Sequence, residues 1–291
     1  GQATVSTPSA NSMLVNQTTN KAILNWQTFN IGSGQSVQFV QPGVSSVALN
    51  RVVGNQASSI YGSLTANGQV FLINPAGVMF APGAQVNVGG LLASSLGISN
   101  ENFLAGNYTF TGNAGGAVEN YGNIRTSSGG YVVLAAPTVM NAGSINANGG
   151  SIGLLAGSRV TVDNSGAGLL KFSVDAAAAQ AAIVNSGEMT ADGGQVAILA
   201  SAMGDAMATV INQTGVIRAN SAVERNGVIV LSGGNNGVVK VAGTIKAAGA
   251  DDGLSGGSVK ILGDKVALLD GTRLDVSGKR AEGQYSSAVI I

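Results

Sequence analysis

The chain contains a repeated unit, and this repetition is the feature that most constrains its fold. Residues 118–136, 139–156 and 183–200 share an apolar residue, Asn-x-Gly, an alternating strand, a Gly-Gly corner and a second strand. Residues 210–232 and 241–262 repeat the pattern in a stretched form. One such unit is too small to bury its own apolar face, so neighbouring units must stack to make a core.

The spacing of corner glycines indicates the size of one coil. Gly187, Gly215, Gly243 and Gly271 follow one another at intervals of 28 residues. Two short strands and three corners in roughly 20–28 residues fit one coil of a parallel β-helix. Side chains that alternate within each strand would then point into the helix. We expect this inward orientation for Ile145, Ala147, Ile152, Leu154, Val196 and Ile198.

Residues 70–95 illustrate how the chain builds these coils. Residues 70–73 are an apolar run of the length expected for a buried strand. Asn74, Pro75 and Gly77 then occupy positions i, i+1 and i+3 of a predicted type I β-turn. Short extended segments and tight corners continue to residue 95, which favours an all-β fold.

Two segments interrupt the pattern. Residues 97–117 carry Phe103, Tyr108 and Phe110, and predict an extra hairpin packed outside the β-helix. Residues 163–182 include an alanine run with helix propensity, and predict a surface loop or a single helical turn.

We expect one domain over residues 1–291. Its expected parts are an N-terminal cap at 1–45, the β-helix at 46–278 and the start of a further coil at 279–291. The last four residues, Ala-Val-Ile-Ile, would leave the final coil without a polar cap. We therefore predict that the chain is the N-terminal piece of a longer protein.

The composition excludes several functional classes. The 14 basic and 14 acidic side chains cancel and form no basic cluster, which argues against a nucleic-acid partner. The sequence has no histidine and no cysteine, so it has no Ser-His-Asp triad, thiolate nucleophile or disulfide. Zero cysteine also suits a chain that crosses an oxidising periplasm unfolded.

An enzyme of the polysaccharide-lyase type is the natural catalytic alternative for a β-helix. It would need acidic residues clustered around calcium, and the acidic residues are scattered here. Asp251 and Asp252 are the one adjacent acidic pair, and their place beside Gly253 indicates a solvated turn. We expect no catalytic residue, no metal site and no cofactor.

Five motifs follow one another in the order and spacing of a known family. They are Asn-Trp-Gln-Thr-Phe-Asn-Ile at 25–31, Val-Gln-Phe at 37–39, Leu-Asn-Arg-Val at 49–52, Ile-Tyr-Gly at 60–62 and Gly-Gln-Val-Phe-Leu-Ile-Asn-Pro-Ala-Gly at 68–77. Over about residues 1–110 the chain resembles the haemagglutination activity domain, the secretion domain of two-partner-secretion exoproteins such as filamentous haemagglutinin and high-molecular-weight adhesins.

Two departures from the family pattern stand out. Ala76 replaces the second Asn of the usual Asn-Pro-Asn-Gly motif, which a type I turn tolerates. The Asn-Pro-Asn-Leu motif of the haemagglutinin branch is missing, and residues 49–52 stand near that region instead. This arrangement is similar to the high-molecular-weight adhesin branch.

The resemblance implies a right-handed parallel β-helix with an N-terminal cap and an extra-helical antiparallel sheet. It also implies a partner, an outer-membrane TpsB-type β-barrel transporter with periplasmic POTRA domains in a Gram-negative bacterium. Export through the periplasm and outer membrane would place the protein at the cell surface or outside, where this domain would fold first and template the rest. The residues expected to form the structural or secretion motif are Trp26, Phe29, Asn50, Arg51, Asn74, Pro75 and Gly77.

A second hypothesis is a β-helical adhesin module that itself binds a host or matrix glycan. We expect a monomer in either case. Whether the whole exoprotein is an adhesin, a haemolysin or a contact-dependent toxin stays open at this point, because that information lies downstream.

Overall fold

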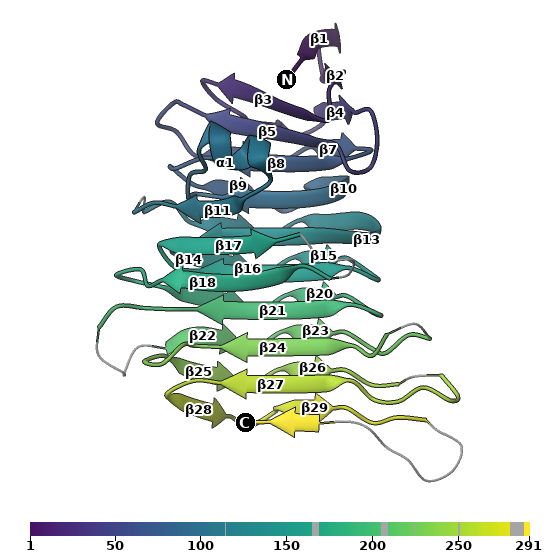
Figure 1. Cartoon of the computed structure of the whole chain (residues 1–291), viewed down its shortest axis with the longest axis vertical. Coiled ribbons are helices and arrows are strands. Elements are labelled where there is room, and N and C mark those ends of the chain that lie inside the picture. Colours follow the sequence, from purple (N-terminus) through teal and green to yellow (C-terminus); the bar gives the residue numbers. More distant parts are fainter. Residues whose placement is uncertain (114, 165–168, 205–208, 224, 250, 280–287) are drawn as a thin grey trace.

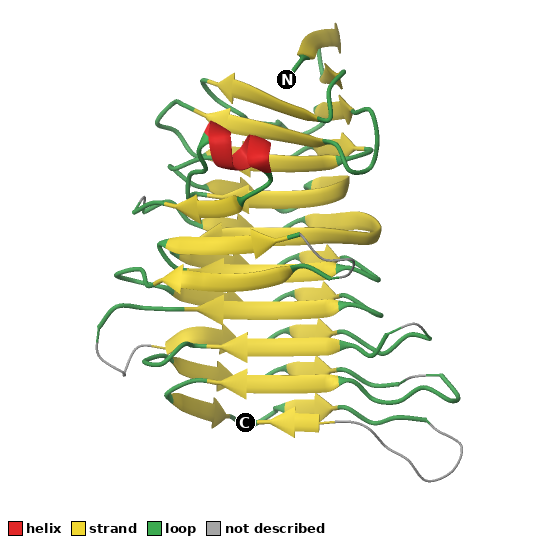
Figure 2. Cartoon of the chain, viewed as in Figure 1, coloured by secondary structure: helices red, strands yellow, loops and turns green. Residues whose placement is uncertain are grey.

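The chain forms a right-handed parallel β-helix whose coils stack from the N-terminus to the C-terminus (Figure 1). The computed structural model describes residues 1–291 except 114, 165–168, 205–208, 224, 250 and 280–287. Strands dominate the described residues, and one short helix lies against their outer surface (Figure 2).

Each coil contributes one longer and one shorter strand, which stack into two rows that we call the long row and the short row. The two rows belong to one 19-stranded sheet, because β10 and β13 each run through both of them. The long row comprises β3 (Lys21–Trp26), β5 (Val47–Val52), β8 (Gln69–Ile73), the second halves of β10 (Gln85–Ser94) and β13 (Asn123–Ala136), β16 (Ser151–Ala156), β21 (Gln195–Ala200), β24 (Val228–Ser232), β27 (Ser258–Leu262) and β30 (Ala288–Ile290). The short row comprises β2 (Ser12–Gln17), β4 (Ser36–Val40), β7 (Ser63–Ala66), the first halves of β10 and β13, β15 (Ser144–Asn146), β20 (Glu188–Thr190), β23 (Val216–Arg218), β26 (Thr244–Lys246) and β29 (Arg273–Asp275).

An 8-stranded parallel sheet completes each coil. Its strands are β6 (Ser58–Ile60), β9 (Val78–Phe80), β12 (Val118–Asn120), β14 (Thr138–Asn141), β19 (Ala182–Asn185), β22 (Thr209–Gln213), β25 (Val238–Val241) and β28 (Lys265–Leu268).

Inward side chains stack in columns along the axis. In the long row, Val132, Ile152, Val196, Ile229 and Val259 are direct parallel neighbours from coil to coil. All six side chains predicted to point inward belong to the buried core, so this prediction is confirmed. The alternation fixes the register, because a slip of one residue would turn every apolar side chain outward.

One column of corner glycines brings successive backbones into close contact. A Cβ on Gly187, Gly215 or Gly243 would lie 2.1 Å from the carbonyl oxygen of the equivalent glycine in the coil before. Gly271 does not continue this column, because the Arg273 amide bonds to the Gly243 carbonyl and Thr272 takes the equivalent place. Gly271 instead has a positive φ of 88° in a turn, so its 28-residue spacing is coincidental.

A buried amide ladder explains the repeated Asn-x-Gly. Asn120 Nδ2 donates to Asn141 Oδ1 at 2.8 Å, and Asn141 Nδ2 donates to Asn185 Oδ1 at 2.7 Å. Asn185 Nδ2 then donates to Gln213 Oε1 at 2.7 Å, and the Gln213 amide ends the ladder on the Gly215 carbonyl at 3.0 Å.

A 3-stranded antiparallel sheet covers part of the long row from outside. It consists of β11 (Tyr108–Thr111), β17 (Arg159–Asp163) and β18 (Lys171–Ala176), and it follows the helix α1 (Asn100–Ala105). The hairpin expected at 97–117 is reduced to one antiparallel bridge between Gly97 and Thr111, because α1 lies between them and β11 pairs along its length with β17. Ser99 caps the start of α1, and Gly106 ends it with φ 83°.

The expected loop or helical turn at 163–182 is corrected for residues 171–182, whereas residues 165–168 lie outside the described part of the chain. Residues 171–176 form strand β18, and Phe172 and Val174 pack on the outer apolar cluster. The alanine run enters the core rather than forming a helix, since Ala178 and Ala181 are buried. Residues 171–176 pair with β17, and Ala178 forms a parallel bridge with Ala202, so pairing with distant strands overrides the local helix propensity.

Within residues 1–45, expected as a cap, β1 (Ala3–Ser9) pairs antiparallel with β2. However, β2 and β3 already pair in parallel with β4 and β5, so parallel coils begin well before residue 46. Most of the segment 279–291 lies outside the described residues, and β30 at its end pairs in parallel with β27.

Candidate functional site

The motif residues predicted from the sequence gather at one corner of the first coils. Register places Trp26 beside Val52, and Arg51 beside Ile73 on the next coil. Because Asn74 directly follows Ile73, the motifs of three successive coils occupy equivalent places. We call Trp26, Phe29, Asn50, Arg51, Asn74, Pro75 and Gly77 the motif corner.

Asn74 organises the turn after β8. The Gly77 amide donates to the Asn74 carbonyl at 2.9 Å, and the Ala76 amide donates to Asn74 Oδ1 at 3.0 Å. The Asn74 side-chain amide donates to the Gln56 carbonyl at 2.9 Å and to Ser58 Oγ at 3.0 Å. Asn74 therefore joins its own turn to the loop before β6, as a buried asparagine must if its polar atoms are to be satisfied.

Gly77 requires the absence of a side chain. Its φ is 113°, and a Cβ there would lie 2.8 Å from the Ala117 carbonyl oxygen. Pro75, by contrast, is exposed at the second position of the turn. The turn thus presents a proline to solvent while its asparagine and glycine face the protein.

Asn50 holds three neighbouring strands together. The Trp26 indole Nε1 donates to Asn50 Oδ1 at 3.0 Å. The Asn50 amide donates to the carbonyls of Ala48 and Phe71, each at 3.3 Å. The Trp26 ring packs edge-on against Phe29 at a centroid separation of 5.5 Å, so both aromatic residues serve as core anchors of the first coil.

Arg51 reaches out of the β-helix to the segment around α1. Its guanidinium donates to the Ile98 carbonyl at 2.7 Å and to Asn100 Oδ1 at 2.9 Å. Lys21, which the motifs did not reveal, bonds the other end of the helix at the carbonyls of Phe103 (3.1 Å) and Leu104 (2.8 Å). The one signal in the sequence was that Lys21 is the first charged side chain of the chain.

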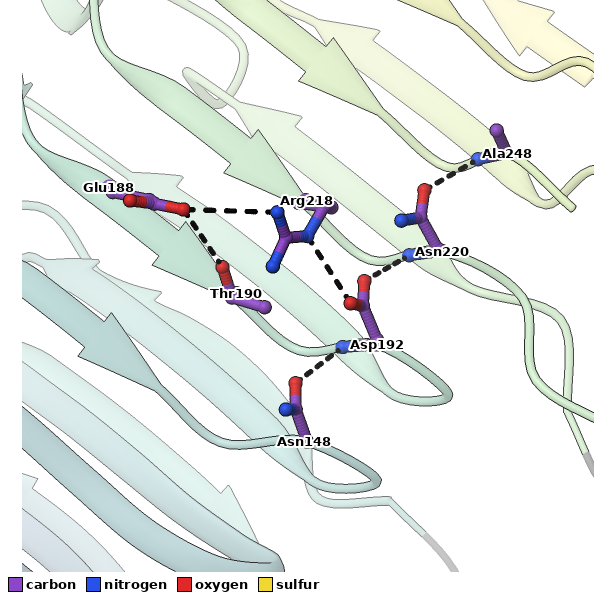
Figure 3. A network of polar contacts seen from close by, with 7 residues as sticks. All are labelled: Asn148, Glu188, Thr190, Asp192, Arg218, Asn220 and Ala248. Carbon is purple, nitrogen blue, oxygen red and sulfur yellow. Dashed lines mark hydrogen bonds and ion pairs between the residues drawn. The ribbon is translucent and has the colours of Figure 1, made fainter. Parts of the chain in front are cut away.

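A second polar cluster lies on the corners of later coils (Figure 3). Asp192 accepts from Arg218 Nε at 3.2 Å and from the Asn220 amide at 2.8 Å. Asn148 Oδ1 accepts from the Asp192 amide at 3.1 Å, and Asn220 Oδ1 accepts from the Ala248 amide at 3.2 Å. Each side chain caps the backbone of the next coil, so the cluster is a structural ladder.

The described residues contain no group of three or more Asp, Glu, His or Cys side chains that could hold a metal ion. Asp251 and Asp252 are exposed. No described helix is long and apolar enough to span a membrane.

The fold and the motif corner place the chain in the class of β-helical domains whose starting end carries specialised contacts. A family model for the TPS secretion domain matches residues 1–250, and the chain belongs to this family. TPS secretion domains are parts of adhesin-like exoproteins that are exported across the outer membrane, and the family is not an enzyme family.

Solved structures agree with this assignment. The HMW1 secretion domain from Haemophilus influenzae superposes with a TM-score of 0.85 and 37% identity, covering 96% of this chain and 72% of that one. The filamentous hemagglutinin secretion domain has a TM-score of 0.59 and 16% identity, covers 99% and 98% of the two chains, and shares the fold.

Two curated relatives are much longer. A heme/hemopexin-binding protein of Haemophilus influenzae is 42% identical over 111 residues, which are 38% of this chain and 12% of the relative. Its counterpart from strain Rd is 39% identical over 171 residues, which cover 55% of this chain and 19% of that relative. This chain thus matches less than a fifth of each relative's length.

Proposed function

We propose that the domain is the export signal of a larger exoprotein, recognised by a cognate outer-membrane TpsB-type β-barrel transporter through its periplasmic POTRA domains. The domain then folds first at the cell surface and templates the coils that follow it. A secreted or surface location and a monomeric state belong to the same proposal.

The observation that carries this proposal is the blunted edge of the short row at the starting end of the β-helix. β1 lies antiparallel on β2, contains Pro8, and has a register shift between Ser6 and Ser9. A short strand with a proline and an irregularity blunts a sheet edge against further pairing. Parallel coils are then added in the C-terminal direction, as the nucleus of a growing solenoid requires.

The motif corner supports a role in building this end. Asn50 and Asn74 are fully buried, and their side chains bond within the domain. They therefore shape the first coils after folding. Recognition is assigned to the extended chain before folding, whose unpaired backbone can add to a sheet edge of the transporter.

An export assay tests the proposal in the full exoprotein. Deleting residues 1–110 should abolish extracellular protein while synthesis in the cell continues. A matched control deletes residues 188–215, one 28-residue repeat, which joins Gly187 to Val216 in the existing register. Undiminished secretion of the first variant would refute the proposal, and the control should retain most of its export.

A binding assay tests the partner. Purified periplasmic domains of the transporter should capture the chain freshly diluted from urea more strongly than the folded domain. Equal or stronger capture of the folded domain would overturn recognition of the extended chain.

A further inference from the structure

The outer face of the first coils is apolar and is covered by a segment distant in the sequence. Leu49 and Phe71 form a second buried cluster with Phe103, Tyr108 and Phe110, separate from the core inside the β-helix. α1 lies in front of β5 and β8, and β11 follows between α1 and β17 (Figure 1). The Phe71 ring lies 5.9 Å from the Phe103 ring and 5.0 Å from the Tyr108 ring, both edge-on. The apolar packing of the first coils is therefore complete only when residues 98–111, the covering segment, lie against their outer face.

Two cations bond the covering segment at the two ends of α1. Arg51 bonds the carbonyl of Ile98 and the side chain of Asn100, at the start of the helix. Lys21 bonds the carbonyls of Phe103 and Leu104, in its last turn. The Phe103 carbonyl also accepts from the Gly106 amide at 3.2 Å, and a cation at the end of a helix interacts favourably with the helix dipole.

Lys21 has a further interaction with the aromatic cluster. Its Nζ lies 5.8 Å from the centre of the Phe103 ring and 5.7 Å from that of Tyr108. Partial burial lowers the pKa of Lys21 from its ordinary value. The hydrogen bonds that both cations donate to the covering segment end on neutral oxygens, the carbonyls of Ile98, Phe103 and Leu104 and the side chain of Asn100.

These contacts span 47 to 83 residues of sequence. We propose that Lys21 and Arg51 are positioning residues for nucleation, which lock residues 98–111 onto β3, β5 and β8 in the rate-limiting step of folding. The smallest folding nucleus then extends from residue 1 through β11, rather than consisting of the N-terminal coils alone. The link to export rests on the proposed function, whereas the folding step rests on these contacts.

Refolding kinetics of the whole 291-residue chain test this inference. Trp26 is the one tryptophan of the sequence and lies in β3, so its fluorescence reports directly on the first coil. The double variant Lys21→Met, Arg51→Met keeps the apolar stems and removes both charges. We expect refolding to slow about tenfold and unfolding to change less than about twofold, because a contact made in the transition state acts on the folding rate.

Matched variants separate this effect from general loss of charge. Lys240→Met with Arg125→Met removes one lysine and one arginine from exposed strand positions and should leave both rates unchanged. Lys21→Arg retains a cation with several donors and should restore most of the refolding rate. Faster unfolding with unchanged refolding, or no change in either rate, would overturn the inference.

Pulse-labelling hydrogen exchange of the wild-type chain gives a readout without mutation. Amides of β3, β5 and β8 should become protected together with those of α1 and β11. Earlier protection of the three strands alone would overturn the inference.

Export of the same variants separates the two proposals. Slow refolding with normal export would support the role of Lys21 and Arg51 in folding. It would contradict the proposal that nucleation of folding drives export. Unchanged refolding would contradict that role and leave the export signal standing.

Discussion

Equivalent positions of the coil are filled differently in two regions of the molecule. At one corner the first coils place Ile60 and Phe80, whereas the middle coils place Asn120, Asn141 and Asn185 in the same column. The first coils are stabilised from outside, by a distant helix and strand. The middle coils are covered from outside by β17 and β18, and they add a buried amide ladder that runs from coil to coil. Both regions therefore use packing on their outer face, and the amide ladder is the contribution that repetition of the coil adds in the middle region.

Removing the outer packing of the first coils should have the largest effect. Phe103→Ala deletes a fully buried ring and should lower the free energy of unfolding by about 4 kcal/mol. Native-state hydrogen exchange should speed up in β3, β5 and β8 far more than in β19 to β27. Leu104→Ala, an exposed neighbour in α1, is the control. Equal acceleration in both regions would mean that the two regions are not stabilised differently.

Interrupting the amide ladder should have the next largest effect, now in the middle coils. Asn141→Leu leaves Asn120 Nδ2 and Asn185 Oδ1 without these partners. Urea unfolding should therefore show a free energy of unfolding that is lower by about 3 kcal/mol. Replacing Asn120, Asn141 and Asn185 together by Leu should cost less than the sum of the single changes, since the first coils already fill this column with apolar residues. Asn123→Leu, at an exposed position, is the control. Strict additivity would contradict a cooperative ladder.

Adding a methyl group to the glycine column should have a smaller effect. Gly187→Ala places a Cβ against the Gly143 carbonyl and should lower the free energy of unfolding by about 2 kcal/mol. In the first coils the equivalent places hold Gly62, where a Cβ would lie 2.2 Å from the Gln35 carbonyl oxygen, and Ala84, whose carbonyl accepts from the Asn123 amide. Ser186→Ala, at the adjacent exposed position, should be nearly neutral. A neutral Gly187→Ala would show that the middle coils accommodate a Cβ in this column as the first coils do at Ala84.

Removing the arginine of the second polar cluster should have the smallest effect on stability. Arg218 lies 3.2 Å from Asp192 and 4.0 Å from Glu188, and its side chain is 39% exposed. Arg218→Met should therefore lower the free energy of unfolding by less than about 1 kcal/mol, and the difference should fade near about 1 M salt. Arg273→Met, at an exposed position of β29, is the control. A larger, salt-independent loss would make this corner as important as the amide ladder.

The motif corner shows how far sequence reasoning reached for the site. Asn74 and Gly77 were placed in the correct turn because turn preferences involve adjacent residues. The bond between Trp26 and Asn50 was not foreseen, since it joins residues on different coils. Lys21 was missed for the same reason, because its partners lie more than 80 residues away.

By itself, the sequence determined the coil: alternation sets which side chains enter the core, and glycine and asparagine mark the corners. These signals are local, because period-two strands and turns are specified by neighbouring residues. Only the tertiary structure decided that β11, β17 and β18 form one outer sheet, and that the alanine run at 176–179 avoids a helix. The physical reason is that long-range pairing and burial outweigh the weak intrinsic preference of a short segment.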